Sequence, residues 1–178
     1  MNDEQTRARF ERLLLPLLTD AYNLARWLMK NQEDAEDMVQ DSYVKAFRFF
    51  GGFHEGGNCR AWFLRIVRNT CYTSLEARKL KEKEVPFEDY EYDVLEDPAP
   101  LPTAVLDKSA TIQGVRKAVE QLPAEFREAL VLREFEGLSY KEIADVSGVP
   151  LGTVMSRLAR ARNQLQVILL EQKKQEIL

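Results

Sequence analysis

The chain has 178 residues, enough for one ordinary domain or two small ones. Hydrophobic residues make up 45% and charged residues 30%, a balance typical of globular rather than disordered proteins. No stretch approaches the ~20 apolar residues of a membrane span, and the charged N-terminus lacks the apolar segment of a secretory signal. Cys59 and Cys71 fit neither a disulfide framework nor a zinc site, and they suit a reducing compartment.

The first half of the chain has the periodicity of helices. Residues 10–29 form a strongly apolar stretch, which Pro16 is expected to break or kink. The next helix is expected to begin after Asn31 as N-cap and to end at Gly51. Its predicted buried stripe is Ala35, Met38, Val39, Ser42, Tyr43, Ala46, Phe47 and Phe50.

An acidic stripe lies opposite that buried stripe. Asp34, Asp37 and Asp41 recur at i, i+3 and i+7. Like charges at this spacing destabilise a helix by a few tenths of a kcal/mol per pair. A pattern that destabilises its own helix indicates that this face binds a basic surface of a partner. An acidic face that is only solvated fits the pattern equally well.

Another helix, residues 61–80, is expected after a glycine-rich loop. Its apolar side carries Trp62, Phe63, Ile66 and Val67, and its other side carries Arg65, Arg68, Asn69 and Tyr72. Basic, amide and aromatic groups at helical spacing suit phosphate contact and stacking on unpaired bases. Phe53, His54 and Asn58 in the loop could hold a base that has swung out of the stack.

Residues 84–110 have a different composition. They contain eight acidic residues, one lysine and the prolines Pro86, Pro98, Pro100 and Pro102. Proline removes a helix donor and like charges repel, so the sequence predicts an extended linker. It would join a helical domain of residues 1–83 to another of residues 111–178.

The second domain contains the strongest local pattern, between Ser139 and Leu158. Ser139 and Glu142 form a capping box that begins a short helix. Ala144 is small, Gly148 four residues later permits a left-handed turn, and Val154 begins the apolar face of a second helix. This spacing predicts a DNA-binding helix-turn-helix.

A further helix is expected before this motif, over residues 124–136. Pro123, expected at position N1, would open it, and Phe126, Ala129, Leu130 and Phe135 would brace the motif.

The outward face of the second helix of this helix-turn-helix carries Thr153, Ser156, Arg157, Arg160 and Arg162. Residues 151–170 include no acidic side chain, so this face suits the DNA major groove. The alternative is a structural helix pair with a solvated face. The motif alone does not identify the class of regulator.

Several motifs together resemble the extracytoplasmic-function sigma factors of bacterial RNA polymerase. The resemblance runs from about Phe10 to Leu165, in the order of the family. Its motifs are Asp34–Asp41, Ala61–Thr70, Leu122–Glu128, Gly137–Ala144 and Gly152–Leu158. It implies an all-α fold of two small domains, a region 2 bundle and a region 4 helix-turn-helix.

The resemblance also implies roles for individual residues. The set that docks on the β′ clamp coiled coil would be Asp34, Asp37, Gln40, Asp41 and Val44. The set that reads and opens the −10 element would be Phe53, His54, Asn58, Arg65, Arg68, Asn69 and Tyr72. The set that reads the −35 element would be Lys141, Thr153, Ser156, Arg157, Arg160 and Arg162. Met155 stands where some relatives have a basic residue, so a base contact is not expected there.

The implied partners are core RNA polymerase, through its β′ and β subunits, promoter DNA and an anti-sigma factor. The resemblance implies a cytoplasmic protein with no catalytic residue, cofactor, metal or membrane insertion.

The sequence is also compared with two other classes of protein. A conventional helix-turn-helix regulator would bind duplex DNA without polymerase. A nucleic-acid enzyme is disfavoured by a single histidine, His54, by the lack of a phosphate-binding loop, and by acidic residues that have no enclosing cage.

Overall fold

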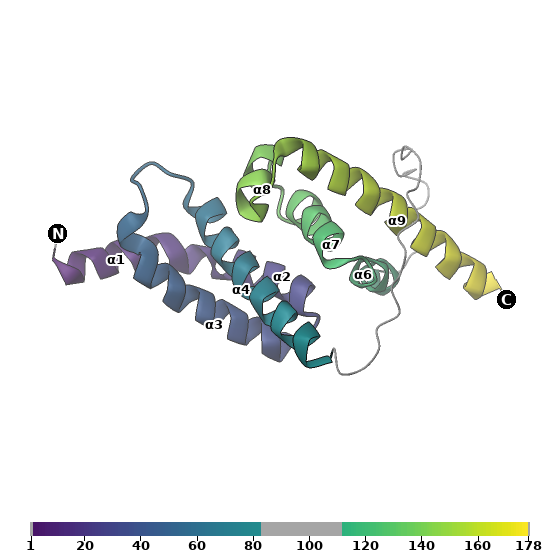
Figure 1. Ribbon diagram of the computed structural model, residues 1–178, viewed down its shortest axis with the longest axis horizontal. Coiled ribbons are helices and arrows are strands. Elements are labelled where there is room, and N and C mark those ends of the chain that lie inside the picture. The colour runs from purple at the N-terminus through teal and green to yellow at the C-terminus, as the bar shows by residue number, and fades with distance from the viewer. Residues whose placement is uncertain (1, 83–111, 178) are drawn as a thin grey trace.

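The computed structural model describes residues 2–82 and 112–177, and over these residues the chain is helical without strands. The helices form two groups, α1 to α4 and α6 to α9 (Figure 1). The prediction of an all-α fold with two small helical domains is confirmed. The predicted linker, residues 84–110, lies outside the described residues, and so do the domain bounds that it sets.

The first group follows the predicted breaks. Its elements are α1 (Asp3–Leu14), the 3-10 turn η1 (Leu15–Leu17), α2 (Leu18–Met29), α3 (Gln32–Phe49), the 3-10 turn η2 (Phe50–Gly52) and α4 (Cys59–Glu82). The break at Pro16 is confirmed, because η1 separates α1 from α2 at this residue. Asn31 caps α3 as predicted, and its side-chain oxygen accepts from the Asp34 amide at 2.8 Å.

Aromatic side chains fill one end of this group. Phe10 is 1% exposed, and its ring meets the edges of Tyr43, Phe47 and Phe50 at centroid distances of 4.9–5.2 Å. The predicted stripe is buried at Ala35, Ser42 and Ala46 of α3 and at Phe50 of η2, and it is half-buried at Met38, Val39 and Tyr43. The prediction is wrong at Phe47, which is 49% exposed: its ring contacts Phe10 at a centroid distance of 5.1 Å, but about half of the side chain stays in solvent.

The second group consists of α6 (Ile112–Glu120), α7 (Ala124–Leu130), the π-helical turn η3 (Val131–Phe135), α8 (Tyr140–Ser147) and α9 (Leu151–Ile177). Two predictions need correction here. Pro123 is the N-cap of α7 rather than its first helical residue, because its ψ of 146° is extended. The expected helix over residues 124–136 is α-helical only to Leu130, and Phe135 lies 53% exposed instead of bracing the domain from inside.

The helix-turn-helix forms as predicted. The Ser139 hydroxyl accepts from the Glu142 amide, and the Glu142 carboxylate accepts from the Ser139 amide, each at 3.1 Å. Gly148 has a φ of 67°, and its amide closes α8 on the Ala144 carbonyl at 2.9 Å. Val154 and Leu158 are each 1% exposed. The turn therefore sets α9 across α8 over a shared apolar core.

The two groups pack on each other. One continuous apolar cluster contains Phe63 and Val67 of α4 together with Leu132, Ile143 and Val146 of the second group. A separate cluster joins α6, α7 and α9. In Figure 1 the second group lies directly beside α4 and α2, while the far part of α9 extends beyond the first group. The described chain is therefore a closed pair of helical domains.

The burial of Cys71 leads to a testable prediction. Cys71 is fully buried on α4, and burial raises the pKa of its thiol to about 12. Because only the thiolate reacts, we expect Cys71 in a Cys59→Ser variant to resist Ellman's reagent at neutral pH in the native protein and to react quickly in urea. Rapid labelling without urea would contradict this packing.

Candidate nucleic-acid interface

The acidic face of α3 divides into two parts. The Asp34 carboxylate accepts from Arg78 at 2.9 Å, and this hydrogen bond lowers the pKa of Asp34. Asp37, Gln40, Asp41 and Val44 are exposed, and neither aspartate forms an ion pair with residues 2–82 or 112–177. Asp34 thus has a partner inside the chain, and the other four residues are free to meet another protein.

An apolar hollow of about 660 Å³ lies beside this face. It is lined by Leu15, Leu18, Tyr22, Val39 and Tyr43, and Asp37 and Gln40 stand at its polar side. Carboxylates next to an apolar hollow suit a partner that carries both cations and apolar side chains.

On α4, three of the predicted DNA-contacting residues form a cluster. The Arg68 guanidinium lies 4.0 Å from the centre of the Tyr72 ring and donates to the Asn69 side-chain oxygen at 3.2 Å. Arg65 lies exposed one turn before Arg68. The structure therefore brings these residues to one face of α4, as the sequence pattern predicts.

That face is turned toward the second group of helices. Arg68 donates to one oxygen of Glu128 at 2.9 Å, and the Tyr72 hydroxyl donates to the other at 2.8 Å. Burial alone would lower the pKa of Arg68, but the charge and hydrogen bond of Glu128, together with Tyr72, outweigh burial and raise the pKa. Burial and then Glu128 raise the pKa of Tyr72, so its hydroxyl stays a donor.

Sequence reasoning gave no role to Glu128. Its side chain is 1% exposed on α7 and also accepts from the Ser147 hydroxyl at 3.1 Å. Its partners on α4 lie 56 and 60 residues earlier in the chain. A local pattern cannot show such a pairing, because helical periodicity relates only residues within a few turns.

The glycine-rich loop does not join this cluster. Phe53 is half-buried: its ring stacks on Phe50 with centroids 6.0 Å apart and is tilted by 46° against Trp62 at 5.1 Å. His54 is exposed. Asn58 caps α4 by accepting from the Ala61 amide and donates to Glu142 of α8, both at 3.0 Å. In this arrangement the Phe53 ring packs against the apolar core of the first group.

Arg60 is a second residue to which sequence reasoning gave no role. Its guanidinium donates to Asp20 at 2.9 Å and to the Glu136 carbonyl at 2.8 Å, with the Glu136 carboxylate at 3.3 Å. Burial raises the pKa of Glu136. Arg60 therefore ties α4 to α2 and to the end of η3.

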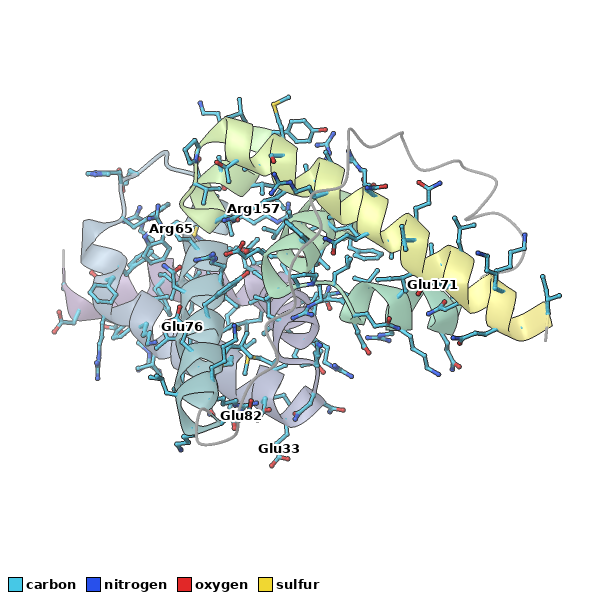
Figure 2. The ribbon with its side chains drawn as sticks, turned by 45° about the vertical axis from the view of Figure 1, so that its right-hand side comes forward. Glu33, Arg65, Glu76, Glu82, Arg157 and Glu171 are labelled. Carbon is cyan, nitrogen blue, oxygen red and sulfur yellow. The ribbon has the colours of Figure 1, made fainter. Side chains whose placement is uncertain are left out.

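A groove of about 1170 Å³ separates α4 from α9. Four of the residues predicted to read the −35 element line it: Thr153, Ser156, Arg157 and Arg160. Arg157 pairs with Glu125 at 3.7 Å, whereas Arg160 is exposed. Arg65 and Arg157 lie between the two groups of helices in Figure 2, far from Glu171 near the end of α9.

The remaining two residues of that set lie elsewhere. Arg162 does not line the groove and donates to Glu134 at 2.9 Å, and Lys141 is exposed on α8. Within the described residues, no group of three metal-ligating side chains occurs, and no helix is long and apolar enough to cross a membrane.

Comparison with known proteins places both halves of the chain in one family. Residues 13–81 match Sigma-70 region 2, and residues 112–165 match Sigma-70 region 4. The ECF RNA polymerase sigma factor SigE of Mycolicibacterium smegmatis is 35% identical over 164 residues, which cover 92% of this chain and 63% of that protein. The RNA polymerase sigma-H factor of Pseudomonas aeruginosa is 34% identical over 88% of this chain and 83% of its own length.

A solved structure agrees with these matches. The sigma factor RpoE of Bartonella quintana, solved with the anti-sigma factor NepR, superposes with a TM-score of 0.71 at 34% identity. The match covers 90% of this chain and 96% of that one. CnrH, with a TM-score of 0.64 at 23% identity, shares the fold. With two sigma regions in order, an intact helix-turn-helix and relatives that are 34–35% identical over most of this chain, the chain belongs to the ECF sigma factors of RNA polymerase.

Proposed function

We propose that this protein binds core RNA polymerase and directs it to specific promoters. One observation carries the proposal: a region 2 bundle with an exposed acidic face on α3 and a region 4 helix-turn-helix occur in the same chain. Asp37, Gln40, Asp41 and Val44 would contact the β′ clamp coiled coil. The protein would act in the cytoplasm, where polymerase works, and would not itself be an enzyme.

Promoter reading would divide between the two regions. The face of α4 with Arg65, Arg68, Asn69 and Tyr72 would contact the unpaired −10 strand. The groove-side face of α9 would enter the major groove at the −35 element. Opening DNA costs a few kcal/mol per unstacked step, and binding energy would supply it. Because one chain joins both readers, each raises the effective concentration of the other.

An anti-sigma factor would control this chain, as NepR binds the related RpoE of Bartonella quintana. The groove between the regions suits an acidic segment of such a partner. It is lined by six cationic side chains, Lys30, Arg78, Lys79, Arg127, Arg157 and Arg160, against Glu76, Glu82 and Glu125. Arg127 Nε and one terminal nitrogen of Arg157 are buried without a hydrogen-bond partner in the described part of the chain. A carboxylate from the partner would satisfy them.

The direct test is transcription in vitro with purified core polymerase, followed by sequencing of the selected promoters. We expect initiation only when both proteins are present, at promoters that share two short elements. If the chain has no affinity for core polymerase but binds duplex operators tightly by itself, it is instead a conventional helix-turn-helix regulator.

Arg160 offers a test of the −35 assignment. Its side chain is exposed on the groove-side face of α9, so Arg160→Ala removes a DNA contact without opening the apolar core. We expect a loss of roughly 1–3 kcal/mol at one base of the −35 element and a relaxed preference there. Holoenzyme binding to a randomised promoter library measures this. Lys173→Ala, exposed on the same helix, is the control, and unchanged promoter choice in both Arg157→Ala and Arg160→Ala would refute the assignment.

A further inference from the structure

Two large apolar side chains stand in solvent at the start of the second helix of the helix-turn-helix. Leu151 is 49% exposed and Met155 is 53% exposed. Neither side chain belongs to the apolar clusters of residues 2–82 and 112–177, and neither lines the groove between α4 and α9. A polar side chain would fit at either position without loss of packing. The fold therefore does not explain why these two residues are apolar.

The two side chains belong to a row on the surface of α9. Met155 follows Leu151 by four residues, and Ala159, which is half-buried, follows Met155 by four more. Residues at this spacing are neighbours on a helix, with Cβ atoms about 5–6 Å apart. A single exposed apolar residue is ordinary on a protein surface, whereas a row makes a continuous apolar strip. Leu151, Met155 and Ala159 are called the apolar row below.

The apolar row lies beside residues that are proposed to read the −35 element. Gly152 and Ser156 each precede a member of the row by three residues, and residues at this spacing are also surface neighbours. Nothing lies within 4 Å of the place where a Cβ on Gly152 would stand, so the first turn of α9 is open to a close approach. In a helix-turn-helix, the N-terminal residues of the second helix contact the base edges. The row thus occupies the part of α9 that would enter the major groove.

The charge around the row indicates which kind of partner covers it. Residues 151–170 contain three arginines and no acidic residue. Such a surface attracts a polyanion, and duplex DNA carries one negative charge per phosphate. The C5-methyl group of thymine is the only apolar group that the base edges present in the major groove. An apolar row inside a cationic surface therefore suits thymine in duplex DNA.

We propose that Leu151 and Met155 contact the C5-methyl groups of thymines in the −35 element. This inference rests on the proposed function, because it requires that this face of α9 enters the major groove there. A thioether is at most a weak hydrogen-bond acceptor, so Met155 does not replace the base contact that a basic side chain would make. Its exposed side chain makes an apolar contact instead. The row adds a preference for A·T pairs to the hydrogen-bonded reading by Ser156 and Arg160.

Replacement of thymine by uracil tests the proposal, because the two bases differ only in the C5-methyl group. Each thymine of the −35 element, on either strand, is replaced in turn in a promoter that transcription in vitro has selected. Holoenzyme made from this chain and core polymerase is titrated against the labelled duplexes at one salt concentration. We expect one or two replacements to weaken binding by about fourfold, which is the affinity equivalent of one buried methyl group.

Met155→Ala and Leu151→Ala remove the proposed partners of the methyl groups. Both side chains are exposed and alanine is the best helix former, so the fold is expected to survive. We expect a uracil replacement that weakens binding by the unmodified holoenzyme to have no effect in the variant that lacks the contacting side chain. Met155→Leu keeps an apolar side chain and is expected to retain most of the difference between thymine and uracil.

Leu170→Ala is the matched control. Leu170 is 42% exposed on the same helix, beyond the helix-turn-helix. We expect this variant to show the same difference between thymine and uracil duplexes as the unmodified chain. Arg160→Ala is expected to weaken binding to every duplex and to leave that difference unchanged, because Arg160 would read its base through hydrogen bonds. Circular dichroism checks the fold of each variant.

The outcomes separate the two proposals. Equal binding of all thymine and uracil duplexes by the unmodified holoenzyme overturns the methyl contact, and so does a uracil effect that persists when Leu151→Ala and Met155→Ala are combined. Weaker binding of these variants to core polymerase without DNA also overturns it, because the row would then face polymerase. In each case promoter-specific transcription upholds the proposed function. Failure of the unmodified chain to initiate transcription with core polymerase overturns the proposed function, and the methyl contact with it.

Discussion

Asp37→Arg combined with Asp41→Arg is expected to abolish the co-purification of this protein with core RNA polymerase. Both aspartates are exposed on α3, and the proposed partner surface on the β′ clamp is basic. Like charges placed across an interface cost several kcal/mol, which corresponds to about a hundredfold or more in affinity. Neither aspartate forms an ion pair with another described residue, so the fold is expected to survive. Titration of labelled chain against core polymerase measures the effect.

The control for this experiment is Glu171→Arg combined with Glu176→Arg. It makes the same change in net charge on exposed positions near the end of α9, far from α3 (Figure 2). We expect this variant to bind polymerase as the unmodified chain does. Normal co-purification of the α3 variant would show that polymerase docks on another surface.

Leu158→Ala is expected to lower the free energy of unfolding by about 2–5 kcal/mol. Leu158 is 1% exposed and packs in the core that joins α9 to α8 and α4. Alanine is the best helix former, so the loss comes from the cavity and not from α9 itself. Urea unfolding followed by circular dichroism measures the change.

Leu170→Ala is the matched control on the same helix. Leu170 is 42% exposed, and a surface substitution of this kind is expected to change the free energy of unfolding by about 0.5 kcal/mol or less. Equal losses in the two variants would show that Leu158 does not brace the helix-turn-helix. Loss of −35 recognition is expected only for Leu158→Ala.

The sequence by itself determined the local structure of both domains. The break at Pro16, the cap at Asn31, the capping box of Ser139 and the turn at Gly148 were predicted and are present. Each depends on backbone geometry or on hydrogen bonds between residues a few positions apart, so the residues themselves carry the information. The helical periodicity likewise marked Arg65, Arg68, Asn69 and Tyr72 as one face of α4.

Only the tertiary structure decided what that face and its neighbours contact. The pairs Arg68 with Glu128, Trp27 with Phe135 and Asp34 with Arg78 join residues that are far apart in the chain. The exposure of Phe47 and Phe135 depends equally on where the helices end and on what packs beside them. Periodicity specifies which side of a helix is apolar, whereas the partner of a polar side depends on how whole helices are oriented in space. Such orientation arises from many distant contacts acting together, and no short stretch of sequence contains it.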